Sequence, residues 1–144
     1  MIIRRPLPDD HAAWRAMWDG YNTFYERTVA EDATAQAWTR ITEGEQPRGF
    51  LAEIDGKAVG FVHWHFHDTN SAVLPQCYLQ DLFTLPEARG KGAGRALIEA
   101  VYAEADRVGV SQVYWLTQDF NTTARALYDK VAVKTPFIKY MHVS

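Results

Sequence analysis

The sequence predicts a single α/β (α+β) domain spanning residues 1–144, in which helices flank a central sheet. Three observations support this fold class. A chain of 144 residues has the length of one ordinary domain. Hydrophobic residues make up 47% of it, which is enough to bury a core. Strand-like and helix-like hydrophobic patterns follow one another in the order β-α-α-β-β-β-α-β-α-β.

The first part of the chain predicts a short strand and two helices. Residues 2–5 form the candidate strand, and Asp9 or Asp10 caps the helix that follows. Residues 31–42 form the second helix. Aromatic and apolar side chains recur along the first helix at steps of three and four residues, which indicates packing on the core for the first three. This stripe consists of Trp14, Met17, Trp18, Tyr21 and Tyr25.

Residues 48–54 and 57–66 predict a hairpin around an Asp-Gly turn. On its second strand His63, His65 and His67 occupy alternate positions and therefore share one face. Their spacing of about 6.5–7 Å is too long for three nitrogens to meet one metal ion easily. We expect half-exposed polar side chains on a solvated face and no metal site, with His63 or His65 as a minor alternative base.

A strand, a glycine-rich turn and a helix are predicted within residues 78–108. The strand covers residues 78–85, and the turn contains Gly90, Gly92 and Gly94. The first amides of a helix have no intrahelical partner, and the helix dipole makes that end positive. Glycines let the backbone approach a ligand closely. The turn therefore predicts a site for a phosphate or pyrophosphate.

The spacing of this turn excludes two common phosphate-binding motifs. Neither the dinucleotide pattern G-x-G-x-x-G nor the Walker pattern G-x-x-x-x-G-K fits. The arrangement Arg89-x-x-Gly92-x-Gly94 fits the [QR]-x-x-G-x-[GA] signature, and D-L-F-T-L-P-E-A-R-G-K-G-A-G resembles the GNAT acyl-CoA N-acyltransferases beyond those letters. The alternative is a strand–helix connection that is glycine-rich without binding a ligand.

A second motif follows the predicted strand at residues 112–116. Asn121, Ala124 and Tyr128 match the pattern N-x-x-A-x-x-x-Y, and Asn121 is a good helix N-cap. In GNAT enzymes this Asn contacts the pantetheine arm and this Tyr hydroxyl lies near the thioester sulfur. Residues 136–142 form the predicted closing strand. The run from Tyr114 onward is similar to a subgroup of fungal histone-, polyamine- and D-amino-acid-acetylating enzymes.

The resemblance covers essentially the full chain and implies the GNAT fold, with a mixed central sheet between helices. It implies acetyl transfer from acetyl-CoA to a primary amine of a small molecule, of polyamine or amino-acid type, by direct attack in a ternary complex. Alternatives are a protein lysine or N-terminal acetyltransferase and a non-catalytic acyl-CoA sensor. The resemblance places coenzyme A binding at Leu82, Phe83, Thr84, Arg89, Gly90, Lys91, Gly92, Ala93, Gly94, Arg95, Asn121, Ala124 and Tyr128.

The sequence indicates the residues that bind the acceptor amine less clearly. Many relatives carry Glu-Asp in the central strand, where this chain has Gln80 and Asp81. We expect Asp81 to orient the amine, with Gln80 as a further substrate-binding candidate. The resemblance also implies that the first two helices wall the acceptor site, which makes Tyr21, Tyr25 and Glu26 substrate-pocket candidates. Strand alternation places Gln80 and Asp81 on opposite faces unless the bulge that the family has at this point intervenes. Tyr128 is the candidate acid that protonates the leaving thiolate.

Composition sets further expectations. The net charge of −3, with no basic block, argues mildly against a nucleic-acid partner and for a cationic amine substrate. A single cysteine, Cys77, fits a reducing cytoplasm. No apolar run reaches the length of a membrane span, so no membrane partner is expected. Homodimers are common among GNAT enzymes, so the resemblance includes a homodimer among the assemblies to test.

Overall fold

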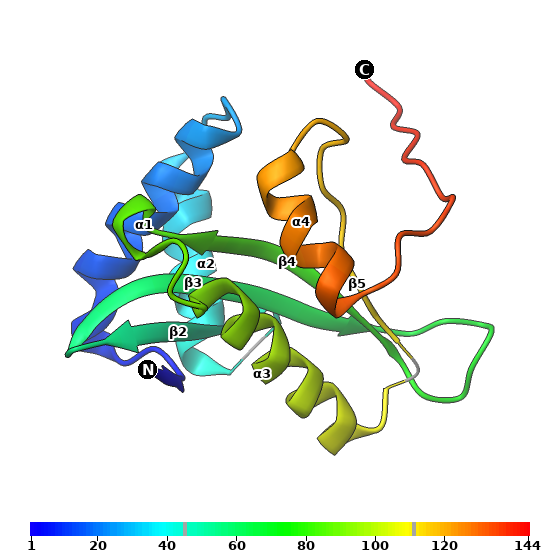
Figure 1. Ribbon diagram of the computed structural model, residues 1–144, viewed down its shortest axis with the longest axis horizontal. Coiled ribbons are helices and arrows are strands. Elements are labelled where there is room, and N and C mark those ends of the chain that lie inside the picture. The colour runs from blue at the N-terminus through cyan, green and yellow to red at the C-terminus, as the bar shows by residue number, and fades with distance from the viewer. Residues whose placement is uncertain (45, 111) are drawn as a thin grey trace.

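The computed structural model describes residues 1–44, 46–110 and 112–144. Its elements follow the predicted order as far as the fourth helix (Figure 1). Short 3-10 turns at Pro8–Asp10 and Pro86–Ala88 precede the first and third helices. The helices and strands are β1 Ile2–Arg4, α1 His11–Phe24, α2 Glu31–Glu43, β2 Arg48–Ile54, β3 Lys57–His67, β4 Gln76–Thr84, α3 Ala93–Val108, β5 Val113–Tyr114 and α4 Thr122–Val131.

The sheet has five strands in the order β1-β2-β3-β4-β5, antiparallel except for the parallel pair β4 and β5. This mixed sheet flanked by helices confirms the predicted fold class. Asp55 and Gly56 form the β2–β3 turn with φ of 51° and 77°. Positive φ at both turn residues matches the twist of the flanking strands, so the Asp-Gly prediction is also confirmed.

Each face of the sheet carries its own core. On one face α1 and α2 pack against residues of β2 and β3 such as Leu51 and Phe61. On the other face α3 packs against the neighbouring positions Ala52 and Val62. Adjacent strand residues point to opposite faces, so one hairpin supplies both cores. Trp14, Met17 and Trp18 are buried, which confirms the predicted core role of the first aromatic stripe.

A bulge in β4 sets the direction of its side chains. His63 pairs with Asp81 and Trp64 pairs with Leu79, which leaves Gln80 as the extra residue. Leu79 belongs to the core beneath α3, whereas Asp81 bonds to α1 on the opposite face. Two residues that would otherwise share a face are therefore separated, and the predicted bulge is confirmed.

Strands β4 and β5 pair only at Cys77–Val113 and Tyr78–Tyr114. Beyond this short ladder the chain of β5 diverges toward α4, and the second half of β4 has β3 as its only strand partner among the described residues. The predicted strand at residues 112–116 is thus shorter in the structure. Beyond the ladder, residues of β4 and α4 line a common cavity.

Two local predictions are wrong, and the capping prediction is confirmed only for the position of Asp10. Residues 136–142 do not form a strand, because the segment runs clear of the sheet and finds no strand partner among the described residues (Figure 1). His63 is buried, not half-exposed, because α1 covers this face of β3. Asp10 occupies the N-cap position of α1, but its carboxylate accepts hydrogen bonds from Arg4 and from the Leu7 amide, which precedes the helix.

No helix within the described ranges is long and apolar enough to cross a membrane.

Candidate active site

The glycine-rich turn has the backbone conformation that its sequence requires. Gly90 and Gly92 have φ of 80° and 83°, a region that other residues enter only with strain. Gly92 is the N-cap of α3, so the amides of the first helical residues point out of the helix without an intrahelical acceptor. With the positive end of the helix dipole, these amides form a site suited to a phosphate group.

Helix α4 faces this turn. The Asn121 side chain caps it by accepting a hydrogen bond from the Ala124 amide at 3.4 Å, as predicted. The Tyr128 ring lies edge-on to Trp115 with centroids 5.4 Å apart. Burial, with a smaller contribution from nearby Tyr25, raises the pKa of Tyr128 to about 12. Its hydroxyl therefore keeps its proton throughout the neutral range.

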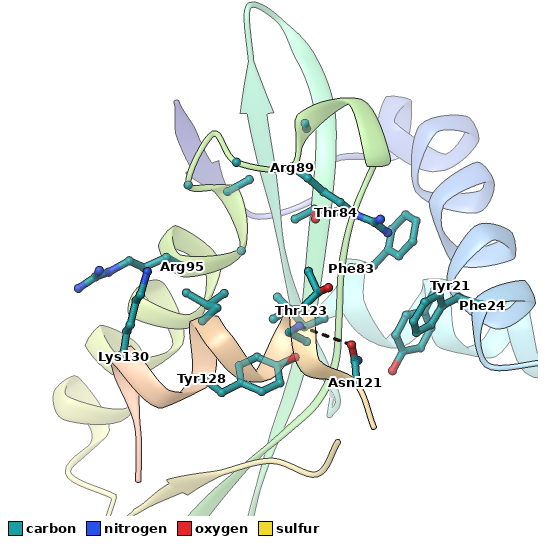
Figure 2. A pocket seen from close by; sticks show the side chains of 18 of the residues that line it. Tyr21, Phe24, Phe83, Thr84, Arg89, Arg95, Asn121, Thr123, Tyr128 and Lys130 are labelled. Atoms are coloured by element: carbon teal, nitrogen blue, oxygen red, sulfur yellow. Dashed lines mark hydrogen bonds between the residues drawn. The ribbon is translucent and has the colours of Figure 1, made fainter. Parts of the chain in front are cut away.

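A cavity of about 530 Å³ joins these parts (Figure 2). The turn and the start of α3 form one end, β4 forms the floor, and α4 and the end of α1 form opposite walls. The lining residues are Tyr21, Phe24, Tyr25, Leu82, Phe83, Thr84, Ala88, Arg89, Gly90, Gly92, Ala93, Gly94, Arg95, Asn121, Thr123, Ala124, Leu127, Tyr128 and Lys130.

Four predicted site residues lie outside this lining. Lys91 is exposed in the turn, and Glu26 follows the end of α1 with its side chain exposed. Gln80 is exposed at the bulge of β4. Asp81 is buried behind Tyr21. The remaining predicted residues, from three separate parts of the sequence, meet at one cavity.

Several lining residues were not among the predicted site residues. Thr123, Leu127 and Lys130 recur along α4 at steps of four and three, so they share the face that carries Ala124. That spacing could have identified them from the sequence. Phe24 reaches the cavity because α1 ends beside β4, which the sequence pattern does not reveal. Tyr21, one of the predicted substrate-pocket candidates, lines the cavity as well.

Positive charge gathers around the cavity. Arg89 lines it, and no described carboxylate forms an ion pair with its guanidinium. In Figure 2 its side chain extends toward Phe83, whereas Arg95 and Lys130 lie toward the other end of the cavity. Arg95 also pairs with Glu99 of its own helix at 2.8 Å. Phosphate groups entering here would meet cations at both ends.

Beneath the α1 wall is a chain of buried polar side chains. The Tyr21 hydroxyl donates to Asp81 Oδ1 at 3.0 Å, and His63 Nδ1 lies 3.0 Å from Asp81 Oδ2. The Trp14 indole N–H donates to His63 Nε2 at 3.1 Å. Indole only donates, so Nε2 must accept and the proton of a neutral His63 sits on Nδ1, facing Asp81. Both oxygens of Asp81 are thus occupied.

This arrangement determines which further hydrogen bonds the Tyr21 hydroxyl can form. Because its proton is engaged by Asp81, the phenolic oxygen offers only lone pairs to another group. Burial and then the charge of Asp81 raise the pKa of Tyr21 well above its usual value. The same two causes raise the pKa of Tyr25, whose ring is edge-on to Tyr21 at 5.0 Å. The wall therefore presents a hydrogen-bond acceptor backed by a carboxylate.

Comparison with known proteins identifies the family. The model of the acetyltransferase (GNAT) family matches residues 12–132. The chain is 34% identical over 143 residues to the D-amino-acid N-acetyltransferase HPA3 of Saccharomyces cerevisiae, covering 97% of this chain and 89% of that protein. It is 32% identical to the uncharacterized N-acetyltransferase YhfO of Bacillus subtilis, covering 97% and 95%. The chain belongs to the GNAT family.

This acetyltransferase uses acetyl-CoA as its acetyl donor and transfers the acetyl group to an amine nitrogen. Solved structures show the same fold at low identity. One is the aminoglycoside N-acetyltransferase AAC(6')-Iy with a bisubstrate analogue of coenzyme A (TM-score 0.84, 21% identity, 99% of this chain and 97% of that one). Another is a ribosomal-protein-alanine N-acetyltransferase of Brucella melitensis (TM-score 0.82, 19% identity, full coverage of both).

The position of Gly94 allows a direct test of whether this turn binds phosphate. Gly94 has ordinary helical backbone, lines the cavity, and a Cβ there would lie 3.4 Å from Leu127. A Gly94→Val protein should therefore fold yet lose coenzyme A binding, because the side chain fills the space between the turn and α4. Isothermal titration calorimetry should detect no binding at concentrations that saturate the parent.

The control is Ala103→Val, which places the same side chain at an exposed position of α3 away from the cavity. It should bind coenzyme A like the parent. Gly92→Val is a poorer test, because its positive φ would distort the turn itself. Normal coenzyme A affinity in a folded Gly94→Val protein would contradict the assignment of this turn.

Proposed function

We propose that this acetyltransferase acetylates a primary amine of a small molecule, of polyamine or amino-acid type, by direct attack on acetyl-CoA in a ternary complex. One observation carries the proposal. A single cavity joins the glycine-rich turn, the Tyr128 hydroxyl and an aromatic wall on which the Tyr21 oxygen can accept a hydrogen bond. Donor and acceptor can therefore occupy the cavity together, with no covalent enzyme intermediate.

The comparisons support a small amine as acceptor. The relative from S. cerevisiae is named for D-amino acids. A relative from Stenotrophomonas maltophilia, 29% identical over 106 residues, is an aminoglycoside N(6')-acetyltransferase. A net charge of −3 also favours approach of a cationic substrate.

On the donor side, the free edge of β4 supplies hydrogen-bond donors. Beyond the two-residue ladder with β5, backbone groups of Leu82, Phe83 and Thr84 line the cavity floor. A backbone amide there can bind the thioester carbonyl and stabilise the oxyanion of the tetrahedral intermediate. The pyrophosphate then lies at the α3 N-terminus, and the pantetheine arm runs beside Asn121.

On the acceptor side, we assign the amine to Tyr21, with Asp81 acting through it. An amine with a pKa near that of lysine is deprotonated in only about one molecule in 10³ at neutral pH. The Tyr21 oxygen can accept an N–H bond from the amine, which orients its lone pair toward the thioester carbon. Asp81 fixes the direction of the Tyr21 hydroxyl and supplies negative charge behind it.

In the transfer, the amine nitrogen bonds to the carbonyl carbon and the C–S bond breaks with its electron pair on sulfur. Tyr128 donates a hydrogen bond, and then its proton, to this sulfur, while the amine nitrogen loses a proton to solvent and Tyr128 is reprotonated from solvent. Since the pKa of Tyr128 is raised to about 12, the hydroxyl is reliably protonated, and its proton moves only as charge builds on sulfur.

A substrate panel tests the proposed function. Acetyl-CoA turnover, read by release of free thiol, should be seen with polyamines or with D- or L-amino acids and should be weak with histone peptides. Turnover with peptides alone would support a protein-modifying enzyme instead. Tight coenzyme A binding with no turnover on any amine would support a non-catalytic sensor.

The role of Tyr128 is tested by Tyr128→Phe. Loss of the hydroxyl should lower kcat by roughly 10²–10⁴ if proton transfer occurs in the transition state. The ring still packs against Trp115, so thermal stability and acetyl-CoA affinity should be retained. If kcat stays within a few-fold of the parent, Tyr128 only packs, and the thiolate leaves with a proton from water or another donor.

The acceptor assignment is tested by Tyr21→Phe. Removing one hydrogen bond should raise the amine KM by about two- to tenfold and leave acetyl-CoA affinity unchanged. Asp81→Asn should act in the same direction, since its amide offers one acceptor oxygen to two donors. The matched control is Tyr102→Phe, whose hydroxyl donates to Val131 outside the cavity. Equal KM effects in the control, or effects on stability alone, would make Tyr21 and Asp81 structural.

A further inference from the structure

The connection from α1 to α2 carries an arginine that has no acidic partner. The guanidinium carbon of Arg27 lies 5.3 Å from the centroid of the Tyr21 ring and 5.8 Å from that of Trp18, so the cation packs on the aromatic wall of the cavity. No described carboxylate forms an ion pair with Arg27, whereas Arg15 of α1 pairs with two. Its charge is therefore available to an anion from outside the chain.

Only neutral groups hold Arg27 in place. Its Nε and Nη2 atoms both donate to Oδ1 of Asn22, at 3.0 and 2.7 Å. Asn22 is buried, and its carbonyl accepts a hydrogen bond from the Arg27 amide at 2.9 Å. An amide oxygen orients the guanidinium without balancing its charge, and it engages only part of the five N–H donors. The cation is thus oriented before a ligand arrives, which lowers the entropic cost of binding one.

The backbone after α1 directs Arg27 back over that helix. Glu26 has φ of 52°, in the left-handed region that glycine usually occupies at the end of a helix. Its amide donates to the Thr23 carbonyl at 3.0 Å, while the Arg27 amide donates to Asn22, which is the pattern of a Schellman motif. A residue with a side chain holds this conformation at a free-energy cost, and such strain concentrates at ligand-binding sites.

The charge of Arg27 acts on two residues that line the cavity, although Arg27 itself is not part of the lining. Burial and then the charge of Asp81 raise the pKa of Tyr21 and Tyr25, and Arg27 is the one group that lowers the pKa in both cases. The wall therefore combines the Tyr21 oxygen, which can accept an N–H bond, with an exposed cation beside the same ring.

We propose that Arg27 binds the carboxylate of the acceptor and so selects α-amino acids over amines that lack an acidic group. This inference rests on the proposed function, in which the acceptor amine binds at Tyr21. In an α-amino acid the nitrogen and the carboxylate are attached to one carbon, so both can contact neighbouring groups of the wall at once. The guanidinium fork matches the geometry of a carboxylate. A polyamine has no anion for Arg27 and brings a second positive charge close to it.

The test compares each amino acid with the amine that remains when its carboxylate is removed. The substrates are the D and L forms of alanine, phenylalanine and ornithine, with ethylamine, 2-phenylethylamine and putrescine as their partners. The parent should show a lower KM for an amino acid than for its partner. Arg27→Gln should raise the KM of that amino acid by about ten- to a hundredfold and change the KM of its partner less than twofold. Each ratio compares two proteins on one substrate, so differences in amine basicity cancel.

Two further variants separate contact from charge. Arg27→Lys keeps the charge but loses the planar fork, so its KM for the amino acid should lie between those of the parent and Arg27→Gln. The control Arg107→Gln removes a positive charge in the last turn of α3, where the side chain pairs with Glu104 outside the cavity, and should behave like the parent on every substrate. Circular dichroism and acetyl-CoA affinity should be unchanged in all three.

The outcomes distinguish this inference from the function on which it rests. Equal rises in KM for both members of a pair would make Arg27 a packing residue, and unchanged KM values would show that it does not contact the acceptor. Either result would overturn the assignment of Arg27 and leave the proposed function intact. So would a parent that acetylates the simple amines and no amino acid. Absence of turnover on every substrate, with acetyl-CoA bound, would instead contradict the proposed function, and the assignment with it.

Discussion

The brevity of the β4–β5 ladder is the constraint on which this active site depends. If β4 and β5 paired along their whole length, the ladder would use the backbone groups of β4 that now face α4. Because pairing stops after Tyr78–Tyr114, the chain diverges and α4 stands away from the floor. The cavity between them brings the N-terminus of α3, residues of β4 and the Tyr128 hydroxyl into one space.

The bulge at Gln80 determines where the charge of Asp81 lies. By adding one residue to β4 it turns Asp81 toward α1 while Leu79 stays in the core under α3. A carboxylate buried without partners would be costly, but here both oxygens accept hydrogen bonds, from Tyr21 and His63. Asp81 therefore places a negative charge close to the cavity but outside its lining. Tyr21, which is hydrogen-bonded to Asp81, lines the cavity.

The same short ladder links the cavity to the outer edge of the sheet. Trp115 directly follows β5 and packs on Tyr128 of the α4 wall, yet β4 holds β5 by only two residue pairs.

The sequence by itself determined the features that depend on local spacing. Helical periodicity placed α1 to α4, the Asp-Gly turn placed the hairpin, and glycine spacing placed the turn before α3. These properties depend on residues a few positions apart, so a linear pattern contains them. The Asn121 cap is of the same kind.

Only the tertiary structure decided which distant groups meet. His63 and Asp81 are opposite each other because of the β3–β4 register and its bulge, and α1 buries them. Strand alternation alone therefore misplaced His63. Residues 136–142 have the composition of a strand, but a strand needs a partner, and the rest of this chain does not supply one within the described residues. Strand pairing depends on two segments, so the pattern of one segment cannot predict it.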